Sequence, residues 1–184
     1  MKNSWMSFIF ILTGISLSNC EYDSYERNTS KYNQRIFFQY EYVNFAWGYQ
    51  HVGWLIDANG NIYCYNNPEN WHYDDSTGYI SSRNMNCNIS ETDSICFKID
   101  SNELDDKIGL IIDASKGDIS EPVHEMYDAG SVVYCGYIYN TYDQKYKKIL
   151  FKQLGDIRIE NSSKASVDLY EWLDSINHLI YNIQ

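Results

Sequence analysis

Alternating apolar and polar positions predict several β-strands along the chain. Between residues 36 and 42 the even-numbered positions are apolar or aromatic, whereas Gln39 and Glu41 stand between them. A period of two is typical of a strand with one buried face. The other strands predicted from such runs lie at residues 95–99, 132–139, 146–152 and 157–159.

A β-hairpin is predicted at residues 52–65, where Asn59-Gly60 separates two apolar runs. Both residues tolerate the positive φ that a type I′ turn requires. With this turn at the tip, Ile56 would face Tyr63 across the ladder. The stretch that begins at Phe37 and ends at Tyr73 is rich in aromatic rings, which include Tyr40, Tyr42, Phe45, Trp47, Tyr49, Trp54, Tyr63, Tyr65, Trp71 and Tyr73.

Helical spacing replaces the alternation in two later segments. Ser101 or Asn102 can cap a helix that ends near Gly117, and its apolar residues recur every three or four positions. A longer amphipathic helix is predicted from about Ser162 to Asn182. Its apolar stripe consists of Ala165, Leu169, Trp172, Leu173, Ile176 and Ile180.

These elements predict one α+β domain over residues 36–184. Its antiparallel sheet would have about five to seven strands, because the strand pairs are joined by short turns, and two helices would pack on one face. Residues 66–83 and 121–130 read as loops, since they carry Pro and Gly with many polar residues.

The N-terminus predicts export. Residues 1–19 have one early lysine, Lys2, and an apolar run that is too short to span a membrane but is typical of a lipoprotein signal peptide. Leu17-Ser18-Asn19-Cys20 resembles a bacterial lipobox, although Asn19 replaces the usual small residue. We therefore expect Cys20 to be acylated with palmitate or a similar chain and residues 20–35 to form a polar tether. The alternative is an ordinary signal peptide with an incidental cysteine.

The other four cysteines form an even set in a chain that is predicted to be exported, where disulfides persist. They are Cys64, Cys87, Cys96 and Cys135. Four cysteines allow three connectivities, and sequence does not choose between them. The pairing Cys87–Cys96 with Cys64–Cys135 is attractive because it closes a short loop, but some of these residues can also stay reduced as buried thiols.

The formal net charge of −11 argues against binding to nucleic acid or to anionic lipid headgroups. A membrane partner would then be engaged through the N-terminal lipid anchor. Aromatic residues make up 16% of the chain, with eighteen Tyr. Tyr suits sheet surfaces and interfaces, although an AT-rich genome explains the same richness.

Several motifs together resemble an uncharacterised group of bacterial lipoproteins. The first part is Tyr42-x-Asn44-x-Ala46-Trp47-Gly48 followed by Gly53-Trp54-x-Ile56-Asp57-x-x-Gly60-x-Ile62-Tyr63. The later part is Tyr127-Asp128-Ala129-Gly130, then Gly155-Asp156, Asn161, Ala165 and Trp172-Leu173. The resemblance covers most of the mature chain and implies a location in the bacterial cell envelope, on either its periplasmic or its cell-surface face. It supplies no site residue.

No catalytic, cofactor-binding or metal-binding residue is assigned from the sequence. The four histidines stand in no metal-ligand spacing, and no nucleophile elbow or phosphate-binding loop is present. His124-Glu125 near Asp128 reads as turn chemistry. Asp57, Asn59 and Asn61 begin like a calcium loop, but the rest of that pattern is missing, so they too read as a turn.

Two functional hypotheses follow. The first is a lipid-anchored envelope protein that acts as a binding or interaction module for a glycan or a protein partner; the alternative is an envelope hydrolase with an unrecognised active site. Because the aromatic-rich region holds more rings than one sheet face easily buries, some should reach the surface and form a ligand rim. The candidate rim residues are Trp47, Tyr49, His51, Trp71 and His72. The opposing interpretation is that these rings are core.

Overall fold

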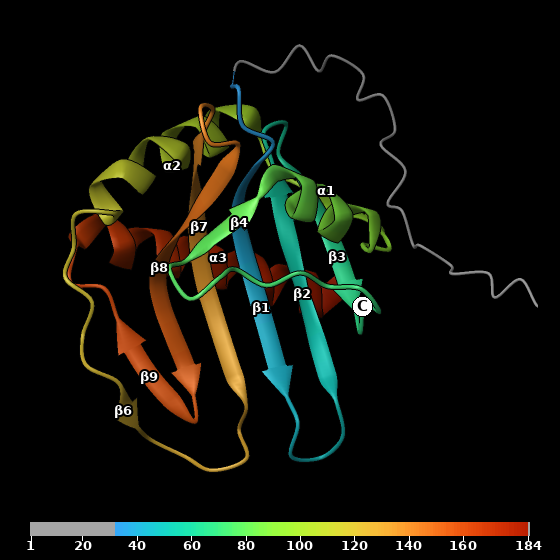
Figure 1. Ribbon diagram of the computed structural model, residues 1–184, viewed down its shortest axis with the longest axis vertical. Coiled ribbons are helices and arrows are strands. Elements are labelled where there is room, and N and C mark those ends of the chain that lie inside the picture. Colours follow the sequence, from blue (N-terminus) through green and yellow to red (C-terminus); the bar gives the residue numbers. More distant parts are fainter. Residues whose placement is uncertain (1–31, 184) are drawn as a thin grey trace, which may run out of the picture.

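The computed structural model describes residues 32–183, which form one large sheet with helices on both faces (Figure 1). The strands are β1 (Ile36–Asn44), β2 (Gln50–Asp57), β3 (Asn61–Asn66), β4 (Tyr79–Ser81), β5 (Ser94–Lys98), β6 (Val123–His124), β7 (Ser131–Asn140), β8 (Lys145–Gly155) and β9 (Ile157–Glu160). The helices are α1 (Ser82–Ser90), α2 (Ser101–Ala114) and α3 (Lys164–Ile183). The expected signal peptide, Cys20 and the tether up to residue 31 lie outside the described residues.

Two antiparallel meanders, β1–β3 and β7–β9, meet side by side at β1 and β7, and the strand order is β5-β3-β2-β1-β7-β8-β9-β6. Strand β4 pairs with the first residues of β8. The α+β class and the antiparallel sheet are confirmed, but the sheet has nine strands rather than five to seven. The two strands missed, β4 and β6, are only three and two residues long, so they leave no alternating pattern in the sequence.

The β2–β3 hairpin is confirmed, but its predicted register is wrong by one residue. Ile56 pairs with Ile62, not with Tyr63. Gly60 alone in the turn has a positive φ, of 79°, and its N–H donates to the carbonyl of Asp57, so the loop has three residues and a glycine bulge instead of a two-residue type I′ turn. The Asp57 carboxylate stabilises this turn by accepting from the backbone N–H groups of Asn59 and Asn61.

Helices α2 and α3 cover one face of the sheet, behind the strands in Figure 1. The predicted stripe of α3 is confirmed, because Leu169, Trp172, Leu173, Ile176 and Ile180 are all buried in a core with β1, β2 and α2. This helix-covered face is almost entirely apolar.

Helix α1 lies on the opposite face, and the sequence pattern did not predict it. Its sequence contains three asparagines, which have weak helix propensity, and only Met85 and Ile89 pack inward among its larger apolar residues. The Ser81 hydroxyl accepts from the N–H of Asn84 and caps the helix. Two helices therefore share one face as expected, and a third occupies the other.

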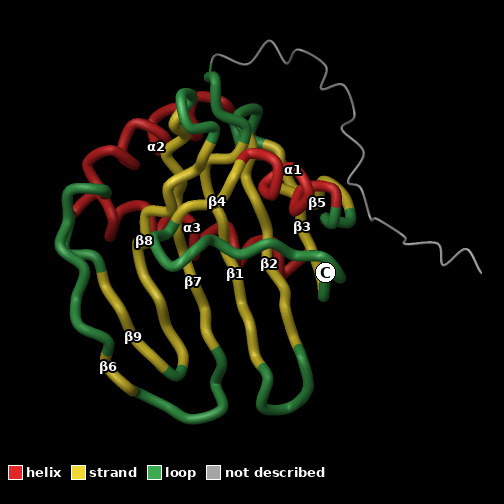
Figure 2. The backbone as a smooth tube through the Cα atoms, in the orientation of Figure 1, coloured by secondary structure: helices red, strands yellow, loops and turns green. Residues whose placement is uncertain are grey.

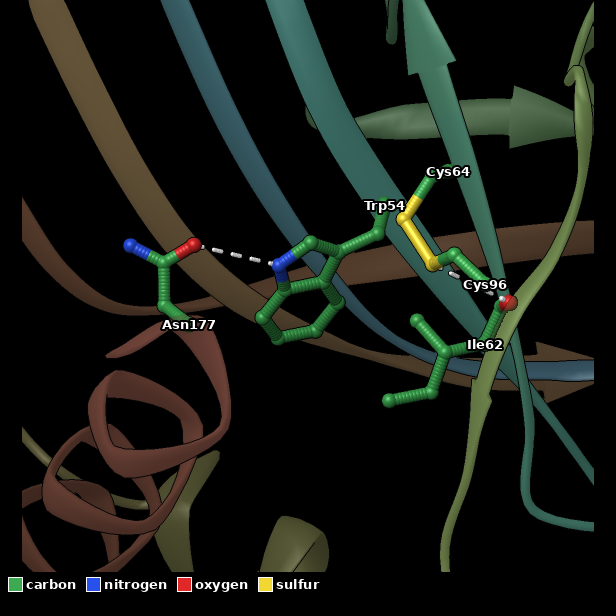
Figure 3. The surroundings of a disulfide bond; sticks show 5 residues. All are labelled: Trp54, Ile62, Cys64, Cys96 and Asn177. Carbon is green, nitrogen blue, oxygen red and sulfur yellow. Dashed lines mark hydrogen bonds between the residues drawn. A yellow bond between two sulfur atoms is a disulfide. The ribbon is translucent and has the colours of Figure 1, made fainter. Parts of the chain in front are cut away.

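One disulfide forms among the described residues, between Cys64 of β3 and Cys96 of β5, and it lies beside Trp54 (Figure 3). The favoured pairing was wrong for two geometric reasons. Cys87 belongs to α1, on the other side of the sheet from the disulfide. Cys135 is a buried thiol on β7, which two strands separate from β3; at about 4.8 Å per strand this spacing exceeds the reach of a disulfide.

A crossing loop over a buried histidine

The chain between β3 and β4 crosses the face opposite α2 and α3, over β2, β1 and β7 (Figure 2). We call residues 67–78 the crossing loop. Polar side chains hold it to the sheet and to α1 at three places. The backbone N–H of His51 donates to the side-chain oxygen of Asn67 at 2.7 Å. The backbone N–H of His72 donates to the side-chain oxygen of Asn88 at 2.8 Å. Lys148 forms an ion pair with Asp74 at 3.0 Å.

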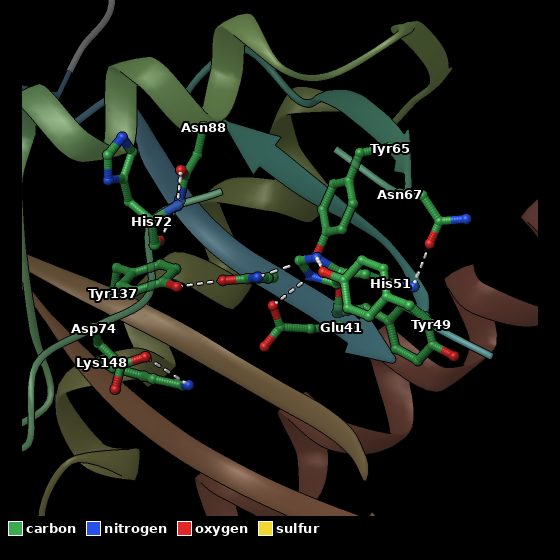
Figure 4. A network of polar contacts seen from close by, with 12 residues as sticks. Glu41, Tyr49, His51, Tyr65, Asn67, His72, Asp74, Asn88, Tyr137 and Lys148 are labelled. Atoms are coloured by element: carbon green, nitrogen blue, oxygen red, sulfur yellow. Dashed lines mark hydrogen bonds and ion pairs between the residues drawn. The ribbon is translucent and has the colours of Figure 1, made fainter. Parts of the chain in front are cut away.

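His51 lies beneath this loop and has no solvent-exposed surface. Its Nε2 is 2.8 Å from Oε1 of Glu41 on β1, and its Nδ1 is 3.1 Å from the hydroxyl of Tyr49 (Figure 4). Because strands β1 and β2 pair Val43 with His51, the Glu41 side chain reaches diagonally across the ladder. The three side chains form a hydrogen-bonded series that runs from the protein surface to its interior.

Aromatic rings enclose His51. The ring of Tyr73 from the crossing loop is stacked on it at a centroid distance of 5.7 Å, and Tyr65 and Trp71 meet it edge to face at 5.2 and 5.3 Å. Burial raises the pKa of the Tyr73 hydroxyl, and the neighbouring Tyr49 and Glu41 raise this pKa further. Such rings exclude water and thereby strengthen the hydrogen bonds of the imidazole.

Beside His51 lies a second buried polar group, Gln39, whose side-chain oxygen accepts from the hydroxyl of Tyr137 and whose nitrogen donates to Tyr65 at 3.1 Å. A Cβ at position 53 would collide with the Tyr65 ring, so Gly53 provides the space in which that ring lies. Burial raises the pKa of both tyrosine hydroxyls. No buried side-chain polar atom of the described residues lacks a hydrogen-bond partner.

Lys148 and Cys135 border the same cluster. Burial alone would lower the pKa of Lys148, yet this pKa is raised because the negative charges that Cys135, Asp74 and Glu41 carry when ionised outweigh the desolvation. Burial raises the pKa of the Cys135 thiol to about 12. Cys135 is therefore protonated at neutral pH and behaves as a small apolar side chain.

At the end of the sheet next to Tyr49, two loops present large apolar side chains to solvent. We call these residues the aromatic loop surface, and they are Phe45 (73% exposed), Trp47 (79%), Tyr49 (47%), Met126 (50%) and Tyr127 (85%). The two loops adjoin, because the Asn44 side chain donates to the carbonyl of Asp128 at 3.1 Å. Tyr49 belongs both to this surface and to the series that ends at Glu41.

A groove of about 580 Å³ lies elsewhere, between α3, β8 and the segment before β6. The lysine that lines it is already paired, because Lys152 lies 3.3 Å from Glu160 and 4.4 Å above the Tyr170 ring. It contains none of the candidate rim residues. We therefore place the candidate site at the crossing loop and the aromatic loop surface, where buried polar groups approach exposed ones.

The structure separates the candidate rim residues. Trp47 and Tyr49 are exposed, Trp71 and His72 are half-buried in the crossing loop, and His51 is buried beneath it. The candidate rim predicted from the sequence did not include Glu41, Tyr73 or Tyr127. Glu41 alternates with apolar residues, so it read as a solvent-facing residue, and Tyr73 and Tyr127 lie in loops whose positions the pattern does not specify.

Comparison with known proteins finds no protein family, no curated protein and no solved structure that matches this chain. Within residues 32–183, no helix is sufficiently long and apolar to cross a membrane. In that same part of the chain, no cluster of three or more His, Cys, Asp or Glu residues is placed to hold a metal ion.

Proposed function

We propose that the protein is a lipid-anchored component of the bacterial cell envelope that binds a partner protein through the aromatic loop surface. The observation that carries this proposal is the set of five exposed apolar side chains on two adjoining loops. Exposed apolar patches with a polar rim mark interaction sites, and Trp, Tyr, Phe and Met are enriched at protein interfaces. A Trp or Tyr at the centre of an interface also contributes most of the binding energy.

The aromatic loop surface is placed for a partner that approaches from the side opposite the lipid anchor. Strand β1 begins at Ile36 at one end of the sheet and leads to the aromatic loop surface at the other end (Figure 1). Nine strand residues extend about 30 Å. An acyl group upstream of Tyr32 would thus attach the domain to the membrane by the end that lies farthest from the aromatic loop surface.

Charge also favours a protein over anionic ligands. The two loops, residues 44–49 and 124–130, contain no Lys or Arg. The nearest arginine, Arg158, is paired with Glu125. Phosphate groups and anionic lipid headgroups would therefore meet no free cation there.

Site-specific photo-crosslinking tests the partner. A photoreactive amino acid replaces Trp47 in one variant and Tyr142 in the control. Tyr142 is 94% exposed but lies in the turn between β7 and β8, at the opposite end of the sheet. We expect a discrete protein adduct in envelope fractions from position 47 and none from position 142. Equal labelling from both positions, or an adduct that contains only glycan, would contradict the proposal.

Metabolic labelling tests the anchor separately. A clickable fatty-acid analogue should label the wild-type protein, and Cys20→Ala should abolish the label because that thiol is the expected acceptor. Label that persists in the variant would show that the N-terminal prediction is wrong, while the crosslinking result would still decide the binding surface.

One observation favours the alternative class, an envelope hydrolase. The series Tyr49–His51–Glu41 has the order hydroxyl, imidazole and carboxylate that activates nucleophiles in hydrolytic enzymes.

A further inference from the structure

We propose that Tyr49 is a nucleophile, activated by His51 and Glu41, that accepts acyl groups from esters. This inference goes beyond partner binding and does not depend on it. Tyr49 is half-exposed at the edge of the aromatic loop surface, whereas both groups behind it are buried. The side chain of Tyr49 can therefore meet a dissolved molecule, while the base to which its hydroxyl is hydrogen-bonded remains shielded from water.

The hydrogen bonds fix the direction of proton transfer. An ionised carboxylate only accepts hydrogen bonds, so the 2.8 Å contact with Glu41 places the proton of neutral His51 on Nε2. Nδ1 then has a lone pair, and at 3.1 Å it accepts from the hydroxyl of Tyr49. This is the tautomer that a general base needs, because the lone pair is directed at the hydroxyl that is to react.

Burial makes the arrangement effective. When Nδ1 takes the proton, the imidazolium that forms lies beside the Glu41 carboxylate and between aromatic rings, where solvent does not screen the attraction. This attraction favours transfer of the proton from Tyr49 to His51.

The proposed step conserves protons and charge. The Tyr49 oxygen attacks the ester carbonyl carbon while its proton moves to Nδ1 of His51, and a tetrahedral intermediate forms. The bond from this carbon to the leaving oxygen then breaks, and that oxygen takes the proton from Nδ1. The products are the free alcohol and an acyl group on the Tyr49 oxygen. Water can later release this acyl group by the same route, with His51 again as the base.

The surroundings indicate a neutral ester with an apolar part. The exposed ring of Phe45 lies 5.3 Å from that of Tyr49, so an apolar group of the substrate would find a contact beside the reacting hydroxyl. No Lys or Arg lies in the loop that carries Tyr49, which disfavours phosphate esters.

The test treats the full-length protein with p-nitrophenyl acetate and identifies the acetylated tyrosines by peptide mapping. Tyr142 is the control within the same molecule: it is 94% exposed against 47% for Tyr49, and its side chain has no neighbouring histidine in any ring contact or hydrogen bond of the described structure. If exposure alone governed labelling, Tyr142 would react faster. We expect Tyr49 to be acetylated about 100-fold faster than Tyr142, the usual effect of a positioned base.

Three variants separate activation from folding. Tyr49→Phe keeps the ring and should remove the label from this site. Glu41→Gln keeps the size of the side chain and an acceptor oxygen but removes the charge, and it should lower the ratio of Tyr49 to Tyr142 labelling at least tenfold while the near-UV circular dichroism stays unchanged. Glu41→Asp should restore part of the ratio because it restores the charge.

Two results would overturn the inference. One is equal or faster acetylation of Tyr142 in the wild-type protein, a comparison that needs no variant to fold. The other is an unchanged ratio in a folded Glu41→Gln variant.

Discussion

The two faces of this sheet carry alternate side chains of the same strands but are built differently. On the helix-covered face, Phe38 and Tyr40 of β1 pack against Trp172 and other apolar residues of α3. On the loop-covered face, the intervening residues Gln39 and Glu41 are just as buried but are polar. One strand thus supplies both an apolar core and a polar interior. Only in the polar interior does each buried side chain need a specific hydrogen-bond partner.

This difference separates stability from chemistry. Burial of apolar area is non-directional and stabilises the fold wherever the side chains fit. A buried carboxylate and imidazole gain little net stability, because desolvation offsets their attraction. A chain that only had to fold could place apolar residues at both positions. We therefore regard the loop-covered face as the functional one, and the following changes test that division.

The largest loss of stability is expected on the helix-covered face. Trp54 is almost fully buried, stacks on Tyr40 and donates its indole N–H to Asn177 (Figure 3). Trp54→Ala should lower the free energy of unfolding by about 3–5 kcal/mol, because it leaves a cavity in a packed core. Urea denaturation measures this loss, and a change below about 1 kcal/mol would show that the core at this position is loose.

Removal of the disulfide should cost less. Cys64 and Cys96 are separated by 32 positions, and their bond restricts the unfolded chain. The double variant Cys64→Ala/Cys96→Ala should lose about 2–4 kcal/mol. The control is addition of a reductant, which should destabilise the wild-type protein and leave the variant unaffected. If the reductant lowers the free energy of unfolding of both proteins equally, the disulfide is not the source of the difference in stability between them.

On the loop-covered face, a single substitution should lower the free energy of unfolding more than a double substitution does. Glu41→Met leaves the buried N–H of His51 without its acceptor and should cost about 1–3 kcal/mol. Glu41→Met/His51→Leu removes both partners and should recover at least part of this loss. Thermal and urea unfolding of both variants decide the point, and a double variant that is less stable than the single one would mean that the pair stabilises the fold.

Alkaline pH should also act on this face. The folded pKa of Cys135 is about 12 against an ordinary 9.0, because the thiol is buried. Above about pH 9 the unfolded chain loses this proton while the folded chain keeps it, so stability falls as pH rises toward 12, by about 1–2 kcal/mol at pH 10. Urea denaturation at pH 8, 9 and 10 measures the slope. Cys135→Ala should make that slope shallower, and an identical slope would exclude this thiol as a cause.

The smallest effect on stability is expected at the aromatic loop surface. Trp47 is largely exposed, so Trp47→Ala should change the free energy of unfolding by no more than about 0.5 kcal/mol while it weakens partner binding. Trp71 is the matched control, because its ring contacts Tyr65 at 4.2 Å and His51 at 5.3 Å. Trp71→Ala should cost more than about 1 kcal/mol. Equal costs would remove the distinction between rim and core that the structure draws.

Prediction from sequence succeeded where a regular pattern was long. The stripe of α3 and the alternation in β1 each repeat over several turns or residues, and both elements were located correctly. Prediction failed where the signal was short or depended on a turn. The register of the β2–β3 hairpin was wrong by one residue because Gly60 forms a bulge, and such a slip moves every side chain of the strand to the other face.

The candidate site could be predicted only in fragments. Tyr49 and His51 were singled out because they stand in an aromatic-rich stretch, but nothing in the sequence joins them to Glu41. That contact exists because β1 and β2 pair in one register, and it is buried because the crossing loop passes over it. Both are relations between different strands and loops, which the alternation along a single strand does not contain.

The sequence by itself determined the α+β class, the positions of the long elements, the acidic charge and the apolar face of α3, because each depends on local composition or local periodicity. The tertiary structure alone decided the disulfide partner of Cys64, the burial of His51 and the exposure of Trp47. Strand order decided the first of these, and the paths of the loops decided the other two. The physical reason is that alternation tells which residues share a face of a strand, but not what will cover that face.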